Sequence, residues 1–69
     1  MNEKNLTCEL KETVDGFDIF RCEAKKEDIF TGELYGQTKV YYDVCYEDAI
    51  VDSFKTLREA RRFAKEYWN

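Results

Sequence analysis

The side chains best suited to chemistry in this chain of 69 residues are three cysteines and fifteen carboxylates. Histidine is absent, so no imidazole can act as a general base or as a zinc ligand. The cysteines Cys8, Cys22 and Cys45 include no Cys-x-x-Cys pair, so they give neither a metal motif nor a redox motif. We expect small, buried, apolar thiols in a reducing compartment, with an oxidised Cys8–Cys22 pair as the alternative.

Catalysis is not expected from these groups. A nucleophilic thiol needs a neighbouring base, and all three cysteines stand in apolar alternations that favour the protonated form. The carboxylates fall on polar strand faces and turns, and neither Glu27-Asp28 nor Glu47-Asp48 has the spacing of a calcium loop. The glycines are isolated and form no phosphate-binding motif. The sequence therefore predicts no enzyme activity, cofactor or metal site.

Period-2 alternation predicts two strands, Leu6–Val14 and Phe17–Lys25, on either side of a turn at Asp15-Gly16. In the first strand the apolar side consists of Leu6, Cys8 and Leu10. A two-residue loop would set apolar residues opposite charged ones, whereas a three-residue loop, Val14 to Gly16, keeps the apolar faces together. The preferred register pairs Leu10 with Phe20, Cys8 with Cys22 and Leu6 with Ala24.

Further strands are predicted at Lys39–Tyr46 and Ala49–Phe54. The first of these is apolar on both faces, which is typical of a central strand or of a binding surface. Residues 26–38 are expected to form a connection with a short strand near Glu33–Tyr35.

A C-terminal helix is predicted from Thr56, because Thr56-Leu57-Arg58-Glu59 is a capping box. Its apolar face is wide enough to lie on a sheet. That face consists of Leu57, Ala60, Phe63, Ala64, Tyr67 and Trp68.

These elements predict one α+β domain over residues 1–69, an antiparallel sheet of three to four strands packed on one C-terminal α-helix. The apolar runs are too short to cross a bilayer, and the N-terminus lacks the layout of a signal peptide. We therefore expect a cytoplasmic protein with no membrane association.

Charge divides the chain into two unlike parts. Residues 1–52 hold six basic and thirteen acidic side chains, whereas residues 53–69 hold five basic and two acidic, and the net charge is −4. The acidic part predicts a surface for a basic protein partner, and solvation of a small sheet is the plainer alternative. The candidate partner-binding residues are Tyr41, Asp43, Tyr46, Glu47, Asp48 and Asp52. The alternative nucleic-acid face consists of Lys55, Arg58, Arg61, Arg62 and Lys65.

The C-terminal stretch from Phe54 to Phe63, following short strands in a small acidic chain, resembles many small proteins of phages and other mobile elements. Some proteins of this size class inhibit host defence, the anti-CRISPR proteins among them, by binding a nuclease or surveillance complex. The resemblance implies a non-enzymatic inhibitor that occludes a basic surface of a nucleic-acid-handling host protein. A direct nucleic-acid binder and a small structural homodimer remain the alternatives, and the net negative charge disfavours the first of them.

Overall fold

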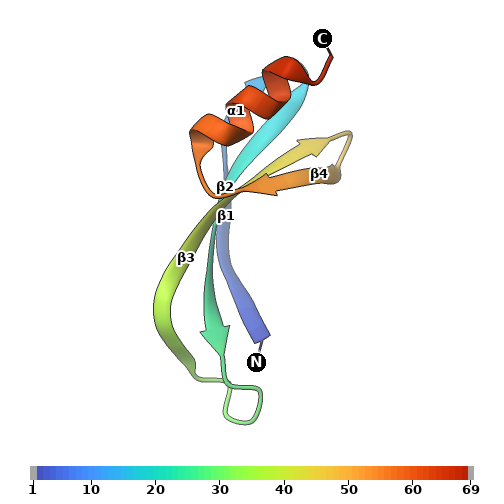
Figure 1. Cartoon of the computed structure of the whole chain (residues 1–69). Coiled ribbons are helices and arrows are strands. Elements are labelled where there is room, and N and C mark those ends of the chain that lie inside the picture. The colour runs from blue at the N-terminus through green and yellow to red at the C-terminus, as the bar shows by residue number, and fades with distance from the viewer. Residues whose placement is uncertain (1, 69) are drawn as a thin grey trace.

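The computed structural model describes residues 2–68, which form four strands and one helix. The sheet has the order β1-β2-β3-β4, and each strand is antiparallel to its neighbours. The helix follows the last strand, so the predicted α+β fold, an antiparallel sheet with a C-terminal helix, is confirmed (Figure 1). The elements are β1 (Asn2–Val14), β2 (Phe17–Glu27), β3 (Leu34–Tyr46), β4 (Ala49–Phe54) and α1 (Leu57–Glu66).

The fold is elongated, with principal extents of 46 × 21 × 17 Å. The cause is the unequal length of the strands, because β4 has 6 residues whereas β3 has 13. Beyond the end of β4, the first three strands continue as a narrow ribbon that ends in the loop 28–33 (Figure 1). The sheet thus has a half that α1 covers and a half, the ribbon, that extends away from it.

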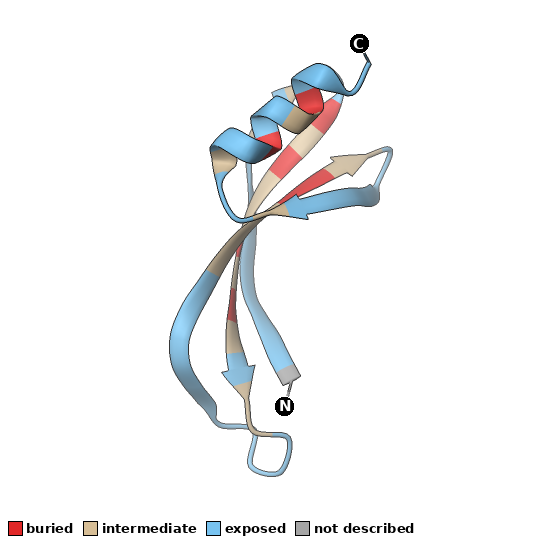
Figure 2. Cartoon of the chain, in the orientation of Figure 1, coloured by how far each residue is buried: buried red, intermediate tan, exposed pale blue. Residues whose placement is uncertain are grey.

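The core lies under the covered half of the sheet. Phe17, Ile19 and Val44 from the strands pack against Ala60 and Ala64 of α1, and each of these five residues is at most 1% exposed. Figure 2 shows most of the buried residues gathered where α1 crosses β2 and β3. Partly buried side chains surround this core: Val14, Tyr42, Tyr46, Phe54, Leu57 and Phe63. The helical part of the predicted apolar face therefore packs on the sheet, whereas Tyr67 and Trp68 follow the last residue of α1 and remain about half exposed.

Thr56 caps α1 as the sequence predicts. Its backbone is extended, with φ −130° and ψ 152°, and its Oγ1 accepts a hydrogen bond from the backbone N–H of Glu59 at 3.2 Å. The cap satisfies one of the N–H groups that have no partner inside the helix.

Replacement of Thr56 by alanine is expected to lower the free energy of unfolding by about 1 kcal/mol, because the Glu59 N–H loses its acceptor. Urea denaturation measures this loss. The matched control is Thr38→Ala on exposed strand surface, which should stay within about 0.5 kcal/mol of the parent protein. Equal stability of Thr56→Ala and the parent would show that the cap contributes nothing.

The first turn differs from the prediction. Val14 pairs with Phe17, so the loop has two residues, Asp15 and Gly16, with φ of 49° and 87°. Two positive φ values define the type I′ turn, whose twist matches that of the flanking strands. The three-residue loop was therefore wrong. The apolar faces come into register instead through a β-bulge between Leu10 and Glu12.

The predicted pairs themselves are mostly correct. Leu10 lies opposite Phe20 and Cys8 opposite Cys22, but a second irregularity between Asn5 and Thr7 places Asn5, not Leu6, opposite Ala24.

Residues 26–38 contain more strand than predicted. β2 continues to Glu27, and the expected short strand near Glu33–Tyr35 is the start of a long β3 that begins at Leu34. The pairing shifts here, because Ala24 lies opposite Lys39 and Lys26 opposite Tyr35. Three residues of β3, 36–38, therefore oppose Lys25 alone. Gly36, with φ 78°, absorbs the irregularity in a conformation that few other residues adopt.

Candidate functional site

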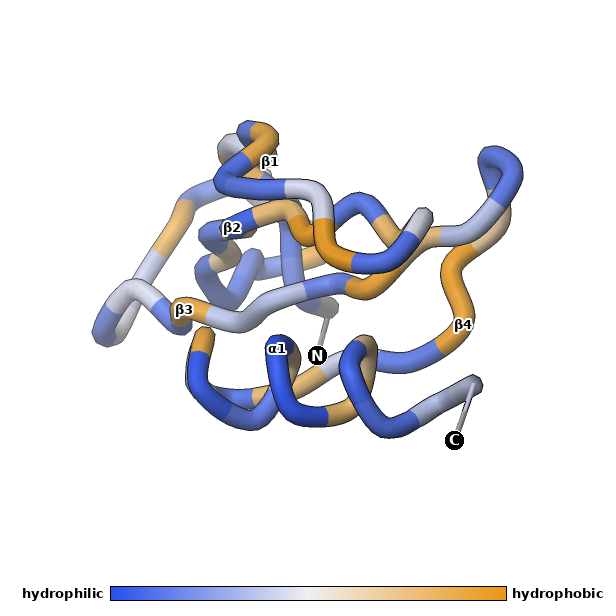
Figure 3. Tube along the Cα trace, turned by 90° about the horizontal axis from the view of Figure 1, so that it is seen from above, coloured by the Kyte–Doolittle hydropathy of each residue, from blue (hydrophilic) through white to orange (hydrophobic). Residues whose placement is uncertain are grey.

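The candidate site is the face of the sheet away from α1, here called the open face. Side chains alternate along a strand, so the neighbours of the core residues Phe17, Ile19 and Val44 point to the opposite side. Figure 3 shows α1 lying along one side of the strands only. By strand register, the open face carries Cys8, Leu10, Asp18, Phe20, Cys22, Ala24, Tyr41, Asp43, Cys45, Ile50 and Ser53.

Of the apolar side predicted for β1, Cys8 and Leu10 lie on this open face, whereas Leu6 falls in the irregularity between Asn5 and Thr7 and is paired with no residue of β2. Cys8 and Leu6 are exposed, and Leu10 is 55% exposed. The predicted alternation was correct for Cys8 and Leu10 but not at Leu6, and the burial expected of Cys8 was wrong. The helix packs on the other face because Phe17, Ile19 and Val44 provide its apolar partners there.

Two contacts cross β2 on the ribbon part of the open face. The hydroxyl of Tyr41, on β3, donates a hydrogen bond to Asn5 Oδ1, on β1, at 2.8 Å. Lys39 Nζ and Glu3 Oε1 form an ion pair at 3.5 Å between the same two strands. Ala24 pairs with Asn5 on one side and Lys39 on the other, so it lies beneath these bridges and is fully buried. A small side chain at this position lets the bridging groups cross.

Tyr41 lies on the open face, as expected of a partner-binding residue, but its hydroxyl is engaged. Burial, and then the carboxylates of Asp43 and Glu3, raise the pKa of this phenol. Tyr41 is therefore a neutral hydrogen-bond donor.

Asp43 is the buried carboxylate of the open face, at 8% exposure. Its Oδ1 accepts a hydrogen bond from Ser53 Oγ at 2.5 Å, and its Oδ2 lies 3.7 Å from Cys22 Sγ. The register explains the geometry, because Ser53 lies directly opposite Asp43 on β4. The carboxylate is thus fixed between a hydroxyl and a sulfur atom.

Cys8 and Cys22 form a disulfide across β1 and β2, with their Cα atoms 4.1 Å apart. The expectation that all the cysteines are buried thiols was therefore wrong for this pair, and the oxidised alternative is the one observed. Cys22 is fully buried, whereas Cys8 is exposed at the edge of the sheet.

Cys45 lies near the turn end of the open face, surrounded by carboxylates. Burial raises the pKa of its thiol, and the carboxylates of Asp43, Asp18 and Asp48 raise it further. Asp18 was not among the predicted site residues. Its position opposite Cys45 depends on the register between β2 and β3, which the sequence did not supply.

The six predicted partner-binding residues do not form one surface. Tyr46 lies on the α1 side, where its ring centroid is 5.4 Å from that of Phe17. Asp52 pairs with Val44 and therefore also points to the α1 side, where it is exposed. Glu47 and Asp48 form the exposed β3–β4 turn. Of the six, Tyr41 and Asp43 lie on the open face, and Asp48, in the adjoining turn, is close enough to Cys45 for its charge to raise the pKa of that thiol.

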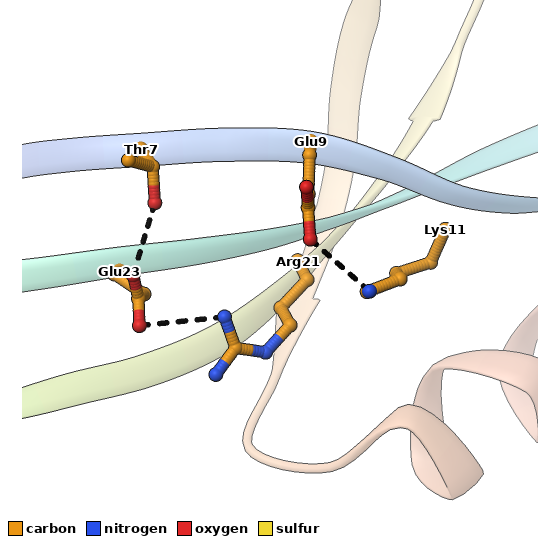
Figure 4. A network of polar contacts seen from close by, with 5 residues as sticks. All are labelled: Thr7, Glu9, Lys11, Arg21 and Glu23. Atoms are coloured by element: carbon orange, nitrogen blue, oxygen red, sulfur yellow. Dashed lines mark hydrogen bonds and ion pairs between the residues drawn. The ribbon is translucent and has the colours of Figure 1, made fainter.

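The surface of the ribbon that faces away from the open face is polar. Thr7 Oγ1 donates a hydrogen bond to Glu23 at 3.1 Å, and Glu23 also pairs with Arg21 at 3.4 Å. Glu9 pairs with Lys11 at 3.1 Å beside them (Figure 4). Exposed pairs of this kind contribute little to stability but keep the surface hydrated. The two faces of the sheet therefore differ in chemistry.

Of the predicted nucleic-acid face, Arg58, Arg61, Arg62 and Lys65 form an exposed strip on the outer side of α1, whereas Lys55 precedes the helix and lines a different depression, with Lys39 and Tyr41. A shallow depression there is lined by Arg58, Arg61, Arg62, Lys65 and Glu66. Arg61 forms an ion pair with Glu12, which raises the pKa of its guanidinium, and Arg62 pairs with Glu66 at 3.3 Å. Two of the strip's arginines are thus already engaged by carboxylates.

No protein-family model, curated protein or solved structure shows significant similarity to the chain. Residues 2–68 contain no cluster of three or more side chains suited to holding a metal ion. Within the same residues, α1 is neither long enough nor apolar enough to span a membrane. The properties of the open face are thus the basis for a functional proposal.

Proposed function

We propose that this chain is a non-enzymatic protein-binding module whose open face contacts a partner rich in apolar and basic side chains. The observation that carries the proposal is the chemistry of that face. Exposed Leu10 and Ile50, at 55% and 64%, flank the acidic cluster of Asp18, Asp43 and Asp48. The face therefore offers apolar side chains on the two edge strands and negative charge between them, which complements a partner that carries both apolar and basic side chains.

The proposal is consistent with the way the sheet is built. A sheet buried on one face normally exposes polar side chains on the other. Here the exposed face instead carries Leu10, Ile50 and the half-buried Phe20. Leu10 and Phe20 are cross-strand neighbours, and exposed apolar side chains of this size on an otherwise hydrated surface are typical of a site of association.

In the inhibitor form of this proposal, the open face covers a basic surface of a nucleic-acid-handling protein and excludes its nucleic acid. The exposed carboxylate of Asp48 and the half-buried one of Asp18 take the place of phosphates, and electrostatic complementarity accelerates association. The alternatives are a second copy of this chain on the same face and nucleic acid on the α1 strip. The ion pairs of Arg61 and Arg62 weaken the latter.

Neutralisation of Asp48 tests the acidic part of this surface. Asp48 has φ 67°, a conformation that asparagine tolerates, so Asp48→Asn removes the charge and keeps the turn. We expect slower association with any captured partner and a weaker dependence on salt, measured by surface plasmon resonance. The control is Asp52→Asn, an exposed aspartate on the α1 side, which should bind like the parent chain. Equal effects of the two substitutions would contradict binding through the open face.

A further inference from the structure

We propose that the Cys8–Cys22 disulfide is a thiol-exchange site, at which a small thiol such as glutathione attacks Cys8 and Asp43 holds the released Cys22 thiol. This inference is independent of whether the open face binds a partner. It rests on the unequal exposure of the two cysteines and on the position of the Asp43 carboxylate.

Attack is directed to Cys8 by access. Cys8 lies on edge strand β1 and is exposed, whereas Cys22 lies on an inner strand and is fully buried. The attacking species is a thiolate. Near Cys22 it meets the Asp43 carboxylate, whose Oδ2 is 3.7 Å from the Cys22 sulfur atom. The same carboxylate also opposes release of Cys22 as a thiolate, so access, and not charge, selects Cys8.

The exchange proceeds in two balanced steps. The external thiolate forms a bond to Cys8 Sγ while the Cys8–Cys22 bond breaks, and Cys22 leaves with the electron pair and takes a proton from water. A second external thiolate then attacks the external sulfur of the mixed disulfide, and Cys8 is released as a thiolate that is protonated in turn. Two small thiols are oxidised to one disulfide, and the protein disulfide is reduced to two thiols.

Asp43 favours the reduced product. A disulfide sulfur has no proton to donate, so the carboxylate gains no hydrogen bond from Cys22 in the oxidised protein. After reduction, the Cys22 thiol can donate a hydrogen bond to Asp43 Oδ2, which lies 3.7 Å from Cys22 Sγ. Ser53 Oγ donates to the other carboxylate oxygen, Oδ1, at 2.5 Å and holds the carboxylate in this orientation. Hydrogen bonds to a charged acceptor are roughly twice as strong as those between neutral groups. The carboxylate therefore shifts the equilibrium towards the dithiol.

The first experiment locates the attacked sulfur in the Cys45→Ser protein, which has no third thiol. The oxidised protein is treated briefly with glutathione, quenched in acid and digested for mass spectrometry. We expect at least about ten times more glutathione adduct on Cys8 than on Cys22. This ratio corresponds to a free-energy difference of about 1.4 kcal/mol. An adduct on Cys22, an equal distribution, or the absence of a protein disulfide after oxidation would overturn the proposal.

The second experiment measures the equilibrium in glutathione buffers of graded ratio. Asp43→Asn should favour the disulfide by about tenfold, or about 30 mV. Asp52→Asn, which alters an aspartate on the other face, should leave the equilibrium unchanged. If the thiol–disulfide equilibrium of Asp43→Asn equals that of the parent chain, Asp43 does not stabilise the dithiol, which contradicts its role in the proposal. The adduct experiment needs no change at Asp43, so it remains decisive if this variant fails to fold.

Discussion

Replacement of Phe17 by alanine is expected to lower the free energy of unfolding by about 3–5 kcal/mol, the usual cost of truncating a buried aromatic side chain. Phe17 is 1% exposed and lies at the centre of the ring cluster. Its ring centroid is 5.1 Å from that of Tyr67 and 5.6 Å from that of Trp68. Removal of this ring therefore leaves a cavity between the sheet and the C-terminal end of the chain's helix. Urea denaturation followed by circular dichroism measures the loss.

The matched control is Phe30→Ala, which makes the same chemical change in the loop 28–33. Phe30 is 90% exposed, so its removal should change the free energy of unfolding by less than about 0.5 kcal/mol. A loss of about 3–5 kcal/mol is a large part of the total stability of a domain this small and can leave Phe17→Ala unfolded. Phe17→Leu removes less of the side chain and therefore serves as a milder second variant. Similar stability of the Phe17 and Phe30 variants would contradict the described core.

Reduction of the Cys8–Cys22 disulfide is expected to cost about 2–3 kcal/mol of stability. The bond closes a loop with a sequence separation of 14. A cross-link of this kind lowers the entropy of the unfolded chain, which stabilises the fold by about 3 kcal/mol. The new hydrogen bond from Cys22 to Asp43 offsets part of this cost. In a domain of this size, the loss corresponds to a fall in Tm of roughly 10–20 °C.

Thermal denaturation with and without dithiothreitol measures this difference. The Cys8→Ser variant has no disulfide, so dithiothreitol should not change its Tm. Cys45→Ser retains the disulfide and should respond like the parent chain. Identical Tm values for the oxidised and reduced parent protein would show that the bond does not stabilise the fold.

The secondary structure was largely predictable because local chemistry determines it here. The capping box located the start of α1, and alternation located the strands. The two-residue turn was not predicted, because without a bulge a loop of Asp15 and Gly16 would pair apolar residues with charged ones. The bulge between Leu10 and Glu12 shifts the register and restores the apolar pairs. The sequence offered no signal for that bulge.

The candidate site was predictable only in part, because it depends on which face of the sheet the helix covers. Both faces carry apolar residues, and alternation alone assigned Leu10 to the interior. The decisive residues are Phe17 and Ile19, whose contacts with Ala60 and Ala64 bring α1 to the other face. Tyr46 was assigned to the binding surface for the same reason, although its ring packs against Phe17 and Trp68.

The measurement that tests the proposed function most directly is affinity capture from a bacterial lysate with two variants of adjacent residues on β1. Leu10→Lys places a charge on the open face, whereas Glu9→Lys alters the polar side shown in Figure 4. We predict that the parent chain and Glu9→Lys retain the same protein, and that Leu10→Lys retains less than about a tenth as much. Equal retention by both variants, or no protein retained by the parent chain, would contradict binding through the open face.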